Sequence, residues 1–158
     1  MKKWMITFIL ATALLILPGY DKNNIVLKDV EVTVIKAEDI LWYDLILKNI
    51  GDTDITSEYE YPGHDHSGFE VVVRPNAKLE KMMEMEEKSK YKKMMFRGGG
   101  GTGFLKIGDD AKFHIDYQIK ETANLDDIKT AAFDGTLILL DGHNIVKEIP
   151  LSEVKSGK

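Results

Sequence analysis

Cysteine is absent from the 158 residues of the chain, and arginine occurs only at Arg74 and Arg97. Without a thiol the chain can form no disulfide, no thiolate zinc site and no thiol nucleophile. Asp and Glu number 26 against 21 Lys and Arg, a formal net charge of −5. Because phosphate recognition needs a basic face, this balance predicts that nucleic acid is not a partner. A hydrophobic content of 44% with 30% charged residues excludes a wholly disordered chain and predicts one folded domain.

The first 19 residues differ from the rest of the chain. Lys2 and Lys3 precede an almost unbroken apolar run over residues 4–17. As a helix this run would extend about 21 Å, which is too short for a hydrocarbon core of roughly 30 Å. A basic start followed by an apolar run of this length is typical of a secretory signal peptide. We therefore predict that residues 1–19 are a signal peptide or, if uncleaved, an N-terminal membrane segment, and that the protein works outside the cytoplasm.

The end of this segment, at Leu17, Pro18 and Gly19, resembles the end of a bacterial lipoprotein signal. In that family the next residue is the cysteine that receives the lipid, whereas this chain has Tyr20. Because tyrosine offers no thiol, the departure removes the lipid anchor that the resemblance implies. We expect residues 20–158 to be either secreted or tethered to the membrane by the N-terminal segment.

From residue 25 onward the hydrophobic period is mainly two, which is the period of a half-buried strand. The clearest case is residues 111–119, where Phe113, Ile115 and Tyr117 alternate with polar side chains. Further candidate strands cover residues 30–34, 41–47, 55–61, 69–73, 104–107, 136–140 and 145–151. Gly, Asn and Asp gather between them, which indicates turns. The pattern predicts an all-β antiparallel sandwich.

Two segments break this period. Residues 124–132 are predicted to form a short helix with Asn124 as its N-cap. Residues 76–103 form an insertion rich in Met, Lys and Glu, where Leu79, Met82 and Met83 have helical spacing. We interpret this insertion as a surface helix or a mobile segment, with the glycines of residues 98–101 as its flexible exit.

Two motifs resemble the immunoglobulin-like β-sandwich modules of bacterial surface proteins and lipoproteins. In the first, a strand ends at Asn49 and is followed by Ile50, Gly51 and Asp52. In the second, residues 104–113 give a hydrophobic strand, a Gly-Asp turn and a strand of alternating polar and apolar residues. The resemblance covers residues 25–151 of a domain spanning 20–158. It implies an immunoglobulin-like sandwich with an extracytoplasmic binding or accessory role.

We therefore predict a non-catalytic module of the bacterial cell envelope, with an unidentified protein or envelope polymer as partner. Loops on a rigid sandwich carry recognition, so residues 64–68 and 82–101 are the expected ligand-facing parts. His114 and Asp116 share the polar face of one predicted strand. No nucleophile motif such as G-x-S-x-G accompanies them, and we predict neither enzyme activity nor an organic cofactor.

The alternative function is copper or zinc binding. His64 and His66 are two residues apart, so on an extended chain they share one side and can converge on one ion. With Asp65 between them, they suit Zn²⁺ or Cu²⁺. The other interpretation of residues 63–68 is a polar connection bounded by glycines.

A methionine cluster is the second candidate metal site. Met82, Met83 and Met85, with Met94 and Met95 further along, supply thioethers, which select Cu(I). The other interpretation is that these methionines fill irregular gaps in the core or form an adaptable contact surface.

Overall fold

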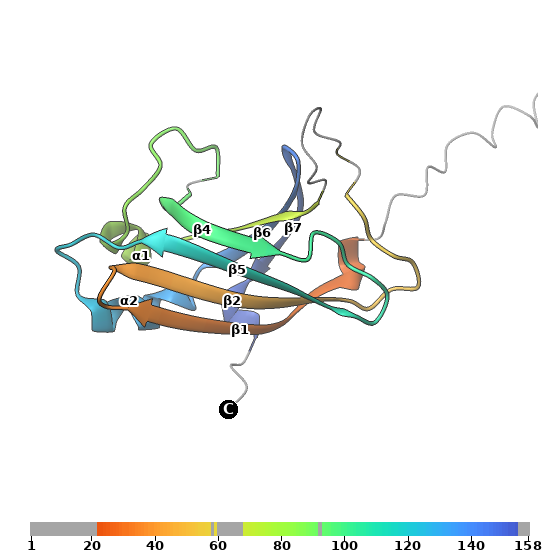
Figure 1. The fold of residues 1–158 in the computed structure, drawn as a ribbon, viewed down its shortest axis with the longest axis horizontal. Coiled ribbons are helices and arrows are strands. Elements are labelled where there is room, and N and C mark those ends of the chain that lie inside the picture. Colours follow the sequence, from red (N-terminus) through yellow and green to blue (C-terminus); the bar gives the residue numbers. More distant parts are fainter. Residues whose placement is uncertain (1–21, 58, 60–67, 92, 155–158) are drawn as a thin grey trace, which may run out of the picture.

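The computed structural model describes residues 22–57, 59, 68–91 and 93–154. Within these ranges seven strands form two antiparallel sheets, which face each other as the two layers of a sandwich (Figure 1). The larger sheet has the order β1-β2-β5-β4, and the smaller sheet has the order β3-β6-β7. The prediction of an all-β antiparallel sandwich is confirmed.

The larger sheet contains β1 (Ile25–Ile35), β2 (Ile40–Asn49), β5 (Asp110–Gln118) and β4 (Phe96–Gly101). The smaller sheet contains β3 (Glu70–Arg74), β6 (Thr136–Asp141) and β7 (Asn144–Pro150). Two short helices, α1 (Ala77–Met82) and α2 (Leu125–Ala132), lie at one end of the sandwich (Figure 1). Single 3₁₀ turns at Lys22–Asn24 and Leu151–Glu153 flank the first and last strands.

The core lies between the sheets and follows from the period of two. On β5, Phe113, Ile115 and Tyr117 are buried, while the polar residues between them face outward. Tyr43 of β2 meets the edge of the Tyr117 ring at 6.1 Å between centroids, a favourable aromatic geometry. The Tyr43 hydroxyl donates to the carbonyl of Ala132, 3.1 Å away, and so joins α2 to the larger sheet.

Helix α2 begins where the sequence predicts. The side chain of Asn124 accepts a hydrogen bond from the backbone N–H of Asp126 at 3.1 Å, which confirms it as the N-cap. Asn76 caps α1 in the same way, because its Oδ1 accepts from Lys78 N and Leu79 N, both at 2.8 Å. Helix α1 ends at Met82, so only the first part of the insertion is helical.

Two predicted strands and one predicted loop are corrected by the structure. Over their described residues, segments 55–61 and 104–107 form no strand and contribute single bridges, Ile55 to Leu105 and Ile107 to Asn49. The glycines of residues 98–101, predicted as a flexible exit, lie instead in β4 beside β5. Glycine has no side chain that can display a period of two, so the sequence pattern does not reveal this strand.

In the described ranges no helix is long and apolar enough to cross a membrane. Residues 1–19, predicted as a signal peptide or N-terminal membrane segment, lie outside the described residues.

Candidate functional site

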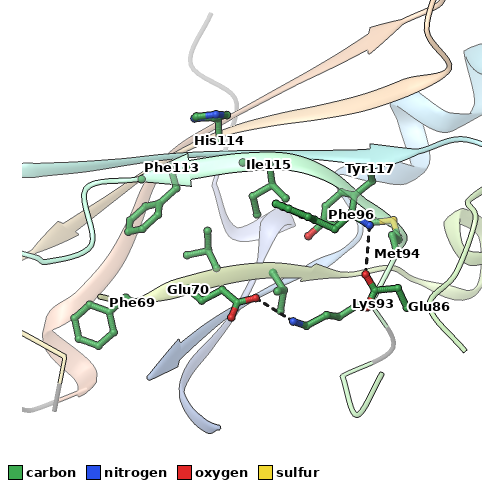
Figure 2. A pocket seen from close by; sticks show the side chains of 15 residues that line it. Phe69, Glu70, Glu86, Lys93, Met94, Phe96, Phe113, His114, Ile115 and Tyr117 are labelled. Atoms are coloured by element: carbon green, nitrogen blue, oxygen red, sulfur yellow. Dashed lines mark hydrogen bonds and ion pairs between the residues drawn. The ribbon is translucent and has the colours of Figure 1, made fainter. Parts of the chain in front are cut away.

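A groove of about 360 Å³ opens between β3 and β4, which are edge strands of the two sheets (Figure 2). The inward face of β5 supplies Phe113, Ile115 and Tyr117 to it, and Phe69 and Phe96 flank these side chains. We call this hollow the β3–β4 groove. Its volume lies in the range of about 300–1,000 Å³ that ligand sites occupy. The groove thus brings apolar side chains of the core next to solvent.

The wall that β4 forms consists largely of glycine backbone. Gly99 and Gly101 pair with Ile115 and Phe113 of β5 and face the groove with them. A Cβ on Gly101 would overlap the Phe113 ring, and a Cβ on Gly99 would lie 2.8 Å from the carbonyl oxygen of His114 and 3.0 Å from Cε2 of Phe96. Both positions therefore require glycine, because the two phenyl rings and the backbone of β5 lie where a Cβ would stand.

Hydrogen bonds close the two ends of the groove. At one end the backbone N–H of Phe69 donates to the carbonyl of Gly103 at 3.0 Å. At the other end the Tyr117 hydroxyl accepts from the backbone N–H of Val73 at 2.9 Å. β3 is an edge strand, so no strand in the described part of the chain bonds to its outer side. The Tyr117 hydroxyl supplies an acceptor there for the Val73 N–H. The edge of β3 is therefore blocked at Val73.

Replacing Tyr117 with phenylalanine tests this closure. The change leaves the buried N–H of Val73 without its acceptor, so we expect the free energy of unfolding to fall by about 2 kcal/mol. Hydrogen exchange at the Val73 amide should accelerate by a larger factor than the fall in the free energy of unfolding would produce by itself. Tyr43→Phe is the matched control, because it removes a buried hydroxyl that contacts Ala132 instead. Equal protection of Val73 in the two variants would contradict the assignment.

An ion pair spans the mouth of the groove. Lys93 Nζ lies 3.0 Å from Glu70 Oε1, and Figure 2 shows the two side chains extended toward each other. Glu86 stands beside them, and its Oε1 accepts a long hydrogen bond of 3.4 Å from the backbone N–H of Phe96. The rim of an apolar groove is thus charged.

The outer edge of β4 is the open edge of the groove. The backbone N–H of Thr102 donates to a carbonyl of β5 at 3.0 Å. In an antiparallel pair every second residue bonds to the neighbouring strand, so this bond shows which residues of β4 direct their backbone groups toward β5. By that alternation Gly98 and Gly100 bond to β5, whereas the N–H and C=O groups of Gly99 and Gly101 point away from it. No backbone group in the described part of the chain bonds to this outer edge. Among the described residues, the edge of β4 therefore presents free donors and acceptors at Gly99 and Gly101, whereas the edge of β3 is occupied at Val73.

The outer face of the larger sheet carries a second group of polar side chains. His114 stacks on Trp42 with centroids 5.3 Å apart, and Asp116 lies on the same face of β5. The Oδ1 atom of Asp116 is buried and has no hydrogen-bond partner among the described residues. Burial raises the pKa of the Asp116 carboxyl; His114 lowers it in part, and Asp44 raises it. His114 also borders the β3–β4 groove, although Figure 2 shows its ring pointing away from the other lining side chains.

Asp116→Asn should make the protein more stable at neutral pH. A carboxyl whose pKa is raised by folding contributes stability that is present below its unfolded pKa of about 4 and lost as the pH rises through the folded value. The neutral amide avoids that loss. We expect the variant to melt above the parent at pH 7 and close to it near about pH 3. A variant that melts lower than the parent at pH 7 would disprove this account of Asp116.

The predicted metal ligands have different positions. His64, Asp65 and His66 lie outside the described residues. Met83 is fully buried in the core, and Met82 and Met85 are partly buried against it. In the described ranges no three His, Cys, Asp or Glu side chains are arranged to hold a metal ion. The copper or zinc site therefore stays a prediction. Met83 packs in the hydrophobic core, as expected if the methionines fill gaps there.

The predicted ligand-facing segment 82–101 borders the β3–β4 groove. It contributes Glu86, Lys93, Met94, Phe96 and three glycines of β4 to the lining. Sequence reasoning missed the other wall, where Phe69, β3 and Tyr117 approach from distant parts of the chain. No local pattern signals that contact, because it depends on how the two sheets stack.

No protein-family model, curated protein or solved structure matches the chain.

Proposed function

We propose that the protein is a non-catalytic binding or accessory module of the bacterial cell envelope, with an immunoglobulin-like sandwich that holds its partner at the β3–β4 groove. The observation that carries the proposal is an apolar groove beside a free strand edge. Rigid sandwiches commonly serve as scaffolds for recognition, so this arrangement favours binding.

The strand order supports the immunoglobulin-like assignment. In a constant-type immunoglobulin domain, the first, second, fifth and fourth strands form one sheet, and the third, sixth and seventh form the other. The orders β1-β2-β5-β4 and β3-β6-β7 follow that arrangement, and every pairing is antiparallel. The inter-sheet disulfide of antibody domains has no counterpart, because the chain has no cysteine.

The composition of the groove supports binding rather than catalysis. Glu70 is held by Lys93, and the remaining walls are mainly apolar side chains and glycine backbone. The residues that line the groove include no serine, threonine or cysteine that could act as a nucleophile. A groove of this kind can hold a ligand but offers no group of converging catalytic side chains.

The extracytoplasmic location in this proposal rests on residues 1–19. Their two lysines and apolar run are typical of export, and the lack of cysteine is compatible with either side of the membrane. The module is then secreted or tethered by its N-terminal segment, and its partner is a protein or polymer of the envelope.

Site-specific photocrosslinking in cells that produce the protein tests this function. The photoreactive residue p-benzoylphenylalanine replaces Phe96, whose side chain is 55% exposed at the groove. Ile145 of β7, 39% exposed and outside the groove, is the control position. We expect one defined adduct with an extracytoplasmic protein or envelope polymer from position 96 and none from position 145. No adduct, the same adducts from both positions, or a cytoplasmic partner would contradict the proposal.

A further inference from the structure

We propose that the occupant of the β3–β4 groove is an extended segment of a partner protein, which adds to β4 as one more antiparallel strand. It carries apolar side chains opposite Gly99 and Gly101 and a basic side chain opposite Phe96, where Glu86 lies. This inference rests on the proposed function and narrows it to one class of partner. Its basis is the free backbone edge of β4, the apolar groove beside that edge and the charge at the rim.

The backbone of β4 is the first requirement. Gly99 and Gly101 direct N–H and C=O groups away from β5, and no described residue pairs with them. Alternating donors and acceptors at this spacing match the backbone of another extended chain, as in recognition by strand addition. Residues 98–101 are all glycine, so this stretch of the edge carries no side chain of its own. A sugar or a lipid lacks the repeating amide groups that would bond to these backbone donors and acceptors.

The groove supplies side-chain pockets for such a strand. In an antiparallel pair, residues directly opposite each other share a face of the sheet. Partner residues opposite Gly99 and Gly101 would therefore direct their side chains into the β3–β4 groove. There they would contact the rings of Phe96 and Phe113, which favour apolar side chains. The intervening partner residues would face the outside of the sheet.

The charge of the rim selects basic residues. Glu70 and Glu86 face one lysine, Lys93, which is engaged by Glu70. Burial raises the pKa of Tyr117, a bond from the backbone of Val73 lowers it in part, and Glu70 and Glu86 raise it further. The lining carries one carboxylate more than it carries lysines, and Glu86 is the carboxylate that Lys93 does not engage. Glu86, beside the first outward N–H of β4, is placed to meet a cation on the incoming strand.

The same observations disfavour the other strand edge and a second copy of the chain. The edge of β3 is blocked at Val73 by the Tyr117 hydroxyl. A second copy brings a net charge of −5 and the same acidic rim, so its approach is opposed by like charge. A basic segment of another protein has the complementary charge.

The test uses a synthetic peptide of seven residues with blocked ends and the sequence Thr-Val-Thr-Val-Thr-Lys-Thr, in which the two valines and the lysine share one face of the strand. It is titrated into the full-length, ¹⁵N-labelled chain in zwitterionic nanodiscs, and the amide resonances are followed by NMR. We expect saturable shifts at Gly99 and Gly101 and slower hydrogen exchange at both amides. An analogue with N-methylated valines keeps every side chain but loses the donors that face β4. It should bind at least about tenfold more weakly.

Charge reversal tests the role of the rim. Glu86→Lys should weaken binding of the lysine peptide about fivefold and strengthen binding of a peptide with glutamate in place of lysine. Glu87→Lys is the matched control, because Glu87 is exposed, adjacent in sequence and absent from the groove lining. Equal effects of the two variants would overturn the charge complementarity.

Three further results would overturn strand addition. They are equal binding of the N-methylated peptide, no binding of the parent peptide at millimolar concentration, and a dimer of the free chain whose contact is mapped to β4. If position 96 crosslinks to an envelope partner while the peptide fails, the proposed function stands and this inference falls. If neither experiment gives binding, both fall.

Discussion

Replacing Asn49 with alanine is expected to lower the free energy of unfolding by about 3 kcal/mol. The Asn49 side chain is fully buried at the end of β2. Its Nδ2 donates to the carbonyls of Thr53 at 2.7 Å and Leu105 at 3.2 Å, and its Oδ1 accepts from Gly51 N at 2.9 Å. Alanine removes all three bonds and leaves a small cavity at a fully buried position. The loop after β2 then loses the bonds to Gly51 and Thr53, and the Leu105 carbonyl keeps only its bond from Ile55 N.

Thermal and urea denaturation measure this effect. Asn124→Ala is the comparison, because it removes one exposed cap bond at the start of α2 and should cost about 1 kcal/mol. If Asn49→Ala destabilises the protein no more than Asn124→Ala does, the network around Asn49 does not hold the loops as described.

Gly101→Ala should be the most damaging small change within β4, with an expected loss of about 2 kcal/mol. The new Cβ would overlap the ring of Phe113, which is only 4% exposed and packed against the core. The ring must leave its position or the strand must move. Because both residues line the β3–β4 groove, the change also alters the shape of the candidate site.

Two further variants make the prediction for Gly101 specific. A Cβ on Gly100 would lie 3.1 Å from Cε1 of His114, the end of a flexible side chain, so Gly100→Ala should change stability by less than about 0.5 kcal/mol. Phe113→Leu combined with Gly101→Ala should cost less than the sum of the two single changes, since the smaller side chain relieves the overlap. Equal costs for the two glycine variants, with additive behaviour in the double variant, would refute the proposed clash.

Elements with a strong local signal could be predicted from the sequence. The alternation around Phe113 and Tyr117 gives β5, and Asn124 with the aspartates after it gives the start of α2. The turn chemistry after Asn49 places the end of β2 correctly. In each case the signal is local, because neighbouring side chains alternate between core and solvent or a side chain bonds to backbone two residues away.

The candidate site could not be predicted in the same way. β4 is nearly all glycine, so it carries no hydrophobic period, and it forms a strand because β5 offers a backbone ladder beside it. The bond from Val73 to Tyr117 joins residues 44 positions apart. The Lys93–Glu70 pair likewise joins the insertion to β3. These contacts depend on the packing of two sheets, which sequence spacing does not encode.

Amide hydrogen exchange along β4 in the free, full-length chain tests the central claim most directly. If β4 is an edge strand bonded only to β5, the Gly98 and Gly100 amides are protected and those of Gly99 and Gly101 exchange rapidly. Protection of all four amides would show that the edge is already covered. Rapid exchange of all four would show that residues 98–101 are not held in the sheet. Either of these last two results would contradict a β3–β4 groove with an open strand edge.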